Sequence, residues 1–127
     1  MPKKHPTVNS ETLLQALNIL KKKRVALFIV AYNAEHHIQQ TLERIPKEIC
    51  SEFIEIYAID DASQDETLAM AERTAQQLDL KNFKVMKTPR NQGYGGNQKL
   101  GYTYAIEQNF DYVILLHGDG QYPPELL

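Results

Sequence analysis

The chain has 127 residues, of which 43% are hydrophobic and 24% charged, with a formal net charge of −2 and a single cysteine. This length suffices for one domain with one core, the near-neutral charge gives no reason to expect nucleic acid as a partner, and the lone Cys50 excludes an internal disulfide. No apolar run approaches the roughly 18 residues of a membrane span, and the polar start is unlike a signal peptide, so the expected location is cytoplasmic.

We expect residues 1–24 to form a basic tail and an amphipathic helix. Leu13, Leu17 and Leu20 recur at helical spacing, and a basic run occupies positions 21–24. Two interpretations of this run remain open. It is the solvated end of a helix, where the helix dipole favours cations, or it lies against anionic headgroups at the cytoplasmic face of a membrane.

The main domain, residues 25–127, begins with an unbroken apolar run over 25–30. A run of this length without alternation predicts a strand buried on both faces, as in a parallel sheet. A helix follows, because Ile38 and Leu42 share one face with Ile45. We expect it to end at Pro46, since proline breaks a helix.

A second strand is predicted over 54–59, followed by the start of a second helix. Ser63 and Glu66 have the spacing of a capping box, in which each side chain satisfies a free backbone N–H at the helix start. The apolar face of this helix is made by four residues: Leu68, Ala71, Ala75 and Leu78.

A third, shorter strand is predicted over 83–87, and a glycine-rich loop over 91–97 leads from it into a helix with Leu100 and Tyr104. A fourth apolar strand is predicted over 112–116. Strand and helix thus alternate, which calls for right-handed crossovers. The sequence predicts an α/β fold: an open, mostly parallel sheet with helices on both faces, cut off after its fourth strand.

In such a sheet, ligands bind outside the carboxyl ends of the strands. Each predicted strand is followed there by polar or glycine-rich sequence. The candidate residues at this edge are, in chain order, Ala31, Tyr32, Glu35, Asp60, Asp61, Arg90, Gly95, Lys99, His117, Gly118 and Asp119.

Asp60 and Asp61 end a buried strand, where an unpaired carboxylate is costly. Their structural alternative is helix capping, but Ser63 is the better cap, which leaves at least one aspartate for a ligand. Asp60 is suited to accept hydrogen bonds from a base or a ribose, as acidic residues at strand ends do in nucleotide-binding folds.

Asp119 lies between two glycines just past the fourth strand. A lone carboxylate there suits Mg²⁺ or Mn²⁺, which takes its other ligands from phosphates and water; the alternative is a simple Asp-Gly turn.

For His117, three roles stay open: a metal ligand, a hydrogen bond to a ribose, or closure of the strand. His36 and His37 are adjacent, make a poor metal pair and are expected to be solvated.

The glycine-rich loop is not a dinucleotide-binding fingerprint, because Gln98 stands where the third glycine belongs and the loop follows the third strand. No phosphate-binding P-loop is present either. Beside Arg90 and Lys99, the loop, with Gly95, is still suited to hold a diphosphate through backbone N–H groups and positive charge.

Together these segments resemble family 2 glycosyltransferases of the GT-A fold, in particular the dolichol-phosphate-mannose-synthase-like branch. The resemblance runs from Val25 to the last residue. Four blocks carry it: Ile29-Val-Ala-Tyr-Asn33 with Glu35, Asp60-Asp61-Ala-Ser63-Gln-Asp65-Glu-Thr67, Arg90-Asn91-Gln-Gly93-Tyr-Gly95, and Gly118-Asp119-Gly120-Gln121-Tyr-Pro123-Pro124-Glu125.

The resemblance implies a UDP- or GDP-sugar donor and a divalent metal, Mg²⁺ or Mn²⁺. Matching positions assign Ala31, Tyr32 and Glu35 to the pocket for base and ribose, Asp60 to the base, and Asp119 to the metal on the diphosphate. The metal would stabilise charge on the departing nucleotide diphosphate, while a polyprenyl-phosphate or glycan acceptor attacks with inversion.

The resemblance also bears on what lies beyond Leu127. The acceptor site and the catalytic base of such enzymes lie in a later half, so we expect this chain to bind donor and to be inactive alone. The family's strand order, 3-2-1-4, leaves the fourth strand at an uncovered edge, and an apolar edge invites pairing with a second copy.

Two departures from the family pattern matter. Val30 stands where the family usually has proline, and His117 replaces the first acid of the D-x-D motif, which reads His117-Gly118-Asp119. A histidine ligates only when neutral, so metal affinity would fall at low pH. The alternative function is therefore a non-catalytic nucleotide-binding or regulatory remnant. A receiver-like domain is disfavoured, because such domains have their acidic pair after the first strand, whereas Asp60 and Asp61 follow the second predicted strand here.

Overall fold

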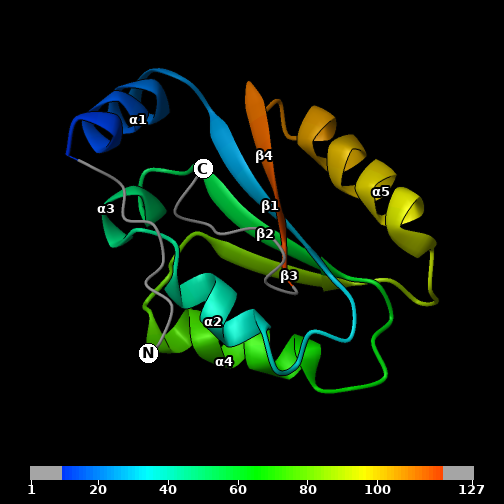
Figure 1. The fold of residues 1–127 in the computed structure, drawn as a ribbon. Coiled ribbons are helices and arrows are strands. Elements are labelled where there is room, and N and C mark those ends of the chain that lie inside the picture. Colours follow the sequence, from blue (N-terminus) through cyan, green and yellow to red (C-terminus); the bar gives the residue numbers. More distant parts are fainter. Residues whose placement is uncertain (1–9, 119–127) are drawn as a thin grey trace.

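The computed structural model describes residues 10–118. Its core is a four-stranded sheet in the order β3-β2-β1-β4, with every neighbouring pair parallel (Figure 1). The elements in chain order are α1 (Ser10–Lys22), β1 (Val25–Ala31), α2 (Ile38–Glu43), α3 (Lys47–Cys50), β2 (Glu55–Asp60), α4 (Thr67–Gln77), β3 (Phe83–Lys87), α5 (Gly93–Glu107) and β4 (Tyr112–His117).

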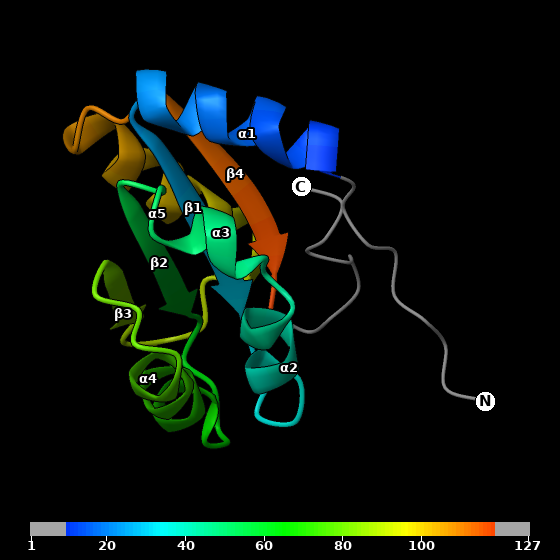
Figure 2. The same ribbon diagram turned by 90° about the vertical axis from the view of Figure 1, so that its left-hand side faces the viewer.

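Helices cover both faces of the sheet, which confirms the predicted fold class. In Figures 1 and 2, α5 lies alone on one face, and α2 and α4 lie on the other. Each face has its own core, because side chains alternate along a strand. Leu27 and Ile29 of β1 pack toward α2 and α4, whereas Phe28 and Val30 pack toward α5.

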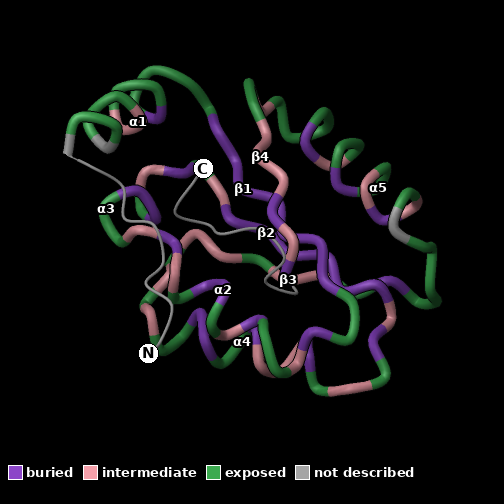
Figure 3. The backbone as a smooth tube through the Cα atoms, viewed as in Figure 1, coloured by how far each residue is buried: buried purple, intermediate pink, exposed green. Residues whose placement is uncertain are grey.

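The central position of β1 explains its sequence. It pairs with β2 on one side and β4 on the other, and all seven of its residues are buried (Figure 3). A strand covered on both faces and both edges has no solvated side, so its sequence is apolar throughout. The expected strand order 3-2-1-4 is thereby confirmed.

The strand β4 lies at one edge of the described sheet, as predicted. It is less buried than β1, and Tyr112 at its start is 57% exposed. An apolar hollow of about 730 Å³ lies between the first half of β4 and α1, and its lining includes Leu20 and Ile114.

Three local predictions about helix boundaries are wrong. Pro46 does not merely end a helix: α2 stops at Glu43, and Pro46 is the N-cap of the short α3, which the sequence did not predict. The capping box at the start of α4 is not formed, because Ser63 binds Asp60 and the helix begins only at Thr67. The glycines expected in a loop instead begin α5 at Gly93.

The first two residues of the basic run at 21–24 lie at the solvated end of a helix, which was one of the two interpretations of this run. Lys21 and Lys22 are exposed in the last turn of α1, where the helix dipole favours positive charge. Arg24 instead fastens the chain to the turn between α5 and β4: its side chain donates to the carbonyls of Gln108 and Asn109, both at 3.2 Å. No helix within residues 10–118 is long and apolar enough to cross a bilayer.

Candidate nucleotide-binding site

The carboxyl ends of β1, β2 and β4 meet at one edge of the sheet. The register pairs Ala31 with Asp60 and Val30 with His117. Two backbone hydrogen bonds extend the pairing beyond the strands: Asp61 N–H donates to the Ala31 carbonyl at 2.9 Å, and Gly118 N–H donates to the Val30 carbonyl at 2.8 Å. Residues far apart in sequence therefore leave the sheet side by side.

A hollow of about 360 Å³ opens at this edge. It is bounded by the ends of β1, β2 and β4 and by the start of α5. Its lining residues are Val30, Tyr32, Asp61, Asn91, Gly93, Asn97 and His117. The wall thus combines an aromatic ring, a carboxylate, two amides and an imidazole, which is a small set of polar groups converging on one cavity, as expected of a ligand site.

Asp61 is held in the wall of this hollow by two hydrogen bonds. Its Oδ1 accepts from the hydroxyl of Thr88 at 3.0 Å and from the backbone N–H of Gln92 at 2.7 Å. Gln92 is the N-cap residue of α5, so the carboxylate lies at the positive end of that helix. Asp61 therefore connects the end of β2 with the residue after β3 and with the start of α5.

Asp60 is placed differently, although it is the adjacent residue. It is 1% exposed and does not line the hollow. Its Oδ1 accepts from the backbone N–H of Ser63 at 3.2 Å and from the Ser63 hydroxyl, while no donor in the described residues reaches its Oδ2. Of the two predicted aspartates, the geometry brings Asp61 and not Asp60 to the cavity.

The loops after β1 and β2 are joined by a set of hydrogen bonds. Three consecutive backbone N–H groups of the first loop donate to side chains of the second loop or of the first residue of α4: Asn33 to Ser63 Oγ at 2.8 Å, Ala34 to Thr67 Oγ1 at 2.8 Å, and Glu35 to Asp65 Oδ2 at 3.2 Å. The Asn33 side chain accepts in return from the backbone N–H of Gln64 at 3.0 Å.

These bonds fix the position of the aromatic side chain that precedes them. Tyr32 is 47% exposed beside the hollow, held between the end of β1 and the joined loops.

Burial alone would raise the pKa of Asp65, but hydrogen bonds from the Thr67 hydroxyl and from the backbone N–H groups of Glu35, Thr67 and Asp65 itself lower it. The carboxylate form of Asp65 is thus the one that joins the loops.

Thr88 and Asn97 contribute to the site but were not among the candidate residues predicted from the sequence. Thr88 orients Asp61, and Asn97 lies fully buried on α5, where its Nδ2 donates to the Ile59 carbonyl at 3.0 Å. A threonine after a strand and an asparagine in a helix carry no signal of their own. Their roles follow only from the packing of α5 and β3 beside β2.

The other predicted residues lie around the same edge with different exposure. Arg90 and Lys99 are exposed, and Glu35 is half-buried. A methyl group at Gly95 would meet no heavy atom within 4 Å, so the backbone there is open to approach. Gly118 is buried, and a methyl group there would lie 3.0 Å from Cδ1 of Ile38, so tight packing explains this glycine.

The predicted metal ligand Asp119 lies outside the described residues. Within residues 10–118, no group of three or more His, Cys, Asp or Glu side chains is close enough to hold a metal ion. His117 lines the hollow at the end of β4, in the same wall as Asp61. The solvated state expected for His36 and His37 is confirmed, since both are exposed.

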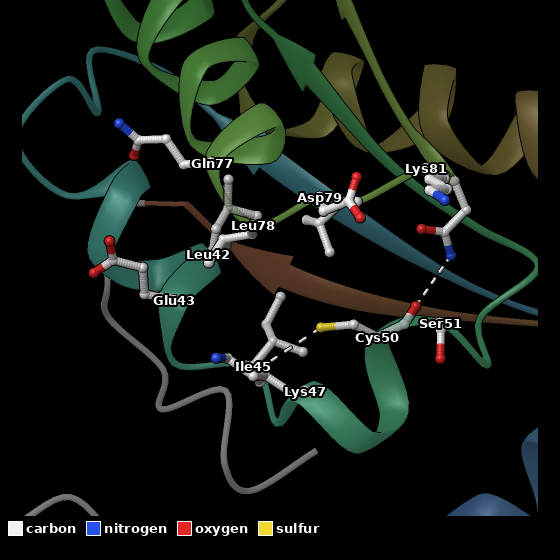
Figure 4. A pocket seen from close by; sticks show the side chains of 12 residues that line it. Leu42, Glu43, Ile45, Lys47, Cys50, Ser51, Gln77, Leu78, Asp79 and Lys81 are labelled. Atoms are coloured by element: carbon white, nitrogen blue, oxygen red, sulfur yellow. Dashed lines mark hydrogen bonds between the residues drawn. The ribbon is translucent and has the colours of Figure 1, made fainter.

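A second cavity, of about 530 Å³, lies at the opposite edge of the sheet, between α2, α3 and the end of α4 (Figure 4). Its wall includes Leu42, Leu78 and Cys50, and the Cys50 thiol donates to the Ile45 carbonyl at 3.9 Å. Burial, and secondarily Glu48, raises the pKa of this thiol, which keeps it protonated. None of the predicted site residues lines this cavity.

Comparison with solved structures supports the fold. The structure resembles the mannosyltransferase PcManGT of Pyrobaculum calidifontis, solved in complex with GDP-Man and Mn²⁺, with a TM-score of 0.66 at 17% identity. The match covers 88% of this chain and 36% of that chain. At this identity, the likeness establishes the GT-A architecture of the described sheet and helices.

Comparison of sequences identifies the family. The chain is 27% identical over 104 residues to an undecaprenyl-phosphate mannosyltransferase of Micrococcus luteus, covering 82% of this chain and 41% of the relative. It is also 27% identical over 105 residues to a dolichyl-phosphate beta-glucosyltransferase of Mus musculus, covering 77% of this chain and 32% of the relative. The chain thus spans less than half the length of these relatives. The sequence profile of glycosyl transferase family 2 matches residues 26–127, and the chain belongs to that family.

Proposed function

We propose that this chain is the part of an inverting glycosyltransferase that binds the nucleotide-diphosphate-sugar donor, a UDP- or GDP-sugar. The observation that carries the proposal is the hollow at the meeting point of β1, β2 and β4, which Tyr32, Asp61 and His117 line together. Ligands of open α/β sheets bind at this edge. The relative from Pyrobaculum calidifontis was solved with GDP-Man, which is a donor of this class.

The nucleoside is the part of the donor that suits the hollow itself. Tyr32 offers an exposed aromatic face for a base, and Asp61 offers carboxylate oxygen to ribose or base donors. The predicted roles of Ala31 and Glu35 in this pocket stand as part of the proposal. Asp60 contributes indirectly, because its hydrogen bonds to Ser63 hold the loop on which Asp61 and the partners of the first loop lie.

The diphosphate is proposed to lie outside the hollow, beside the start of α5. Arg90 and Lys99 are exposed on this side, and the open surface at Gly95 allows a phosphate to approach the backbone. Positive side chains favour phosphate oxygens. These residues would hold the leaving group while the acceptor attacks the sugar.

We propose that a divalent ion, Mg²⁺ or Mn²⁺, binds after the end of β4. Carboxylate and imidazole are suitable ligands for such an ion, and His117 ends β4 directly before Gly118 and Asp119. We propose Asp119 as its main protein ligand, with His117 as a second. When bound, the ion would stabilise negative charge on the departing nucleotide diphosphate.

The acceptor is proposed to be a polyprenyl phosphate or a glycan, by analogy with the lipid phosphates in the names of the two relatives. Because the chain spans 41% and 32% of those relatives, the catalytic base is expected beyond Leu127. The 127-residue chain would then bind donor without transferring sugar. Detection of transfer to any acceptor by this chain alone would contradict this part of the proposal. Its proposed place is the cytoplasm, at the inner face of a membrane that holds the acceptor.

The replacement of the first D-x-D acid by His117 favours a second candidate, a nucleotide-binding remnant without activity. The two candidates differ in the longer protein. A remnant would bind nucleotide and metal but hydrolyse or transfer no sugar, even when residues beyond 127 are present. His117→Asp would raise metal affinity in either case, but would raise turnover only in an enzyme.

Thermal unfolding with UDP or GDP, each with and without Mn²⁺, tests donor binding. A ligand at 100 times its Kd adds about 2.7 kcal/mol to the free energy of unfolding, which moves the midpoint by several degrees. We expect a shift only with metal, abolished by Asp119→Asn and retained by the control Asp79→Asn, which changes an exposed aspartate at the far end of α4. If the chain is folded but neither UDP nor GDP shifts its unfolding midpoint, with or without Mn²⁺, the proposal is contradicted.

We also propose that the isolated chain self-associates through β4. The strand lies at an edge of the described sheet, and an edge strand can pair with a strand of another chain. Tyr112, at 57% exposure, lies beside the apolar hollow under α1. Light scattering would give a dimer for the wild type and a monomer for Tyr112→Lys. A monomeric wild type at high concentration would count against the proposal.

A further inference from the structure

Asn97 carries a buried acceptor atom that the fold itself does not use. The residue is 0% exposed, and its Nδ2 donates to the Ile59 carbonyl at 3.0 Å. The carbonyl can only accept, so it fixes the orientation of the amide and turns Oδ1 away from it. No donor in the described part of the chain lies within hydrogen-bonding distance of Oδ1.

An unpaired buried acceptor is destabilising, and few occur in a folded protein. Asn97 is also one of the residues that line the hollow with Asp61 and Tyr32. The position is the second turn of α5, on the face that packs against the end of β2. The residue that carries the unused acceptor is therefore part of the wall of the proposed donor site.

The chemistry of this wall favours a neutral group that donates hydrogen bonds. The start of α5 attracts anions, but Asp61 already occupies that position, since its Oδ1 accepts the Gln92 N–H at 2.7 Å. A phosphate placed beside Asn97 would meet this carboxylate and an amide oxygen, both of them acceptors. A hydroxyl or a ring N–H meets the same two acceptors favourably.

We propose that Asn97 is a specificity-determining residue of the donor site, whose Oδ1 accepts a hydrogen bond from the nucleoside and not from the diphosphate. The group it accepts from is either a ribose hydroxyl or a ring N–H of uracil or guanine. This inference rests on the proposed nucleotide-binding function and adds to it a residue that orients the nucleoside from the α5 side.

Calorimetric titration of the 127-residue chain with Mn²⁺ and UDP, GDP or pyrophosphate tests the inference. Asn97→Leu keeps the size of the side chain and removes the acceptor. We expect about tenfold weaker binding of the nucleotide that the wild type prefers, which corresponds to about 1.4 kcal/mol, and unchanged binding of pyrophosphate. The matched control is Asn82→Leu, which removes an amide that donates to the Cys50 and Phe53 carbonyls at the other edge of the sheet.

Two further ligands distinguish the sources of the hydrogen bond. If a ribose hydroxyl donates, the 2′- or 3′-deoxy nucleotide lacking it binds the wild type as weakly as the parent nucleotide binds Asn97→Leu. If the base donates, CDP, which has no ring N–H, binds wild type and Asn97→Leu alike. Equal nucleotide affinity of wild type and Asn97→Leu would overturn the inference while leaving the proposed function standing; a wild type that binds no nucleotide would overturn both.

Should Asn97→Leu fail to fold, the wild type alone decides the matter by NMR. The side-chain amide signals of Asn97 are expected to shift on addition of nucleotide with Mn²⁺ and to stay in place with pyrophosphate and Mn²⁺. The side-chain amide signals of Asn82 serve as the internal reference. Signals of Asn97 that respond to pyrophosphate as strongly as to nucleotide would overturn the inference.

Discussion

Gly101 packs directly against the ring of Phe28: a methyl group on its Cα would lie 1.9 Å from Cε2 of that ring. This close approach brings α5 onto β1, and the Gly101 carbonyl accepts the Tyr57 hydroxyl at 2.8 Å in the same place. Phe28 and Tyr57 are stacked with ring centroids 5.0 Å apart. The core between α5 and the sheet therefore requires glycine at position 101, because any side chain there would overlap the Phe28 ring.

Gly101→Ala is expected to destabilise the fold by about 1–3 kcal/mol, because overpacking forces the helix away from the ring. Urea denaturation followed by circular dichroism measures the change. Gly95→Ala is the matched control on the same helix, since a methyl group there meets nothing within 4 Å. It should stabilise the chain by up to about 1 kcal/mol, so equal effects of the two variants would contradict this packing.

Asp61→Asn and Asp60→Asn separate binding from folding at two adjacent residues. Asp61 lines the hollow, so Asp61→Asn should weaken metal-dependent nucleotide binding about tenfold or more. Asp60 is 1% exposed and bound to Ser63, so Asp60→Asn should lower the midpoint of thermal unfolding with less effect on affinity. Titration calorimetry and thermal unfolding of both variants check this, and the reverse pattern would restore Asp60 as the ligand residue.

The α5 face predicts a loss of stability at alkaline pH. Burial, and then the hydrogen bond to Glu55, raises the pKa of Tyr104 to about 12, and burial followed by the charges of Tyr104, Glu55 and Tyr102 raises that of Tyr57 further. A phenol in the unfolded chain titrates near 10. The stability contributed by both neutral phenols is therefore complete below about pH 10 and is lost as the pH rises toward 12.

Denaturant unfolding between pH 8 and 12 measures this loss. Tyr104→Phe removes one of the two phenols and its hydrogen bonds of 2.8 Å to Glu55, so its free energy of unfolding should depend less on pH above 10 than that of the wild type. Tyr112→Phe is the control, because Tyr112 is 57% exposed. Identical pH profiles for wild type and Tyr104→Phe would contradict the prediction.

Ala62 adopts a left-handed backbone conformation, with φ of 56°. This conformation costs an L-residue about 1 kcal/mol or more relative to the right-handed region, and glycine does not pay it. Ala62→Gly should therefore raise the free energy of unfolding by several tenths of a kcal/mol, because the greater flexibility of glycine in the unfolded chain offsets part of the gain. Ala34→Gly, at a buried position without positive φ, should instead destabilise.

The centre of the sheet was predictable from the sequence because β1 is an uninterrupted apolar run and β4 is apolar up to His117. Val25 to Val30 reads as a buried strand whatever surrounds it, and the parallel order followed from the resemblance to the family. Helix starts were less predictable, because they depend on which of several competing partners a side chain binds. Ser63 has the sequence signature of a cap, yet the Asp60 carboxylate three residues earlier takes its hydroxyl.

The candidate site was predictable as an edge of the sheet but not atom by atom. Asp60 and Asp61 are neighbours in sequence, but Asp60 is still part of β2 and lies on the face of the strand that packs toward α4. Asp61 follows the strand and turns toward α5. Asn97 depends on a carbonyl 38 residues away. Such pairings are set by the tertiary packing of α5, which no local pattern encodes.

The joined loops after β1 and β2 have a consequence for the dynamics of the site. The N–H groups of Asn33, Ala34 and Glu35 belong to no helix or strand, yet each is bonded to a side chain some 30 residues further along. In hydrogen–deuterium exchange these three amides should be protected like those of a strand, and they should exchange together when the second loop opens. The two loops beside Tyr32 then form a cooperative unit that opens as a whole.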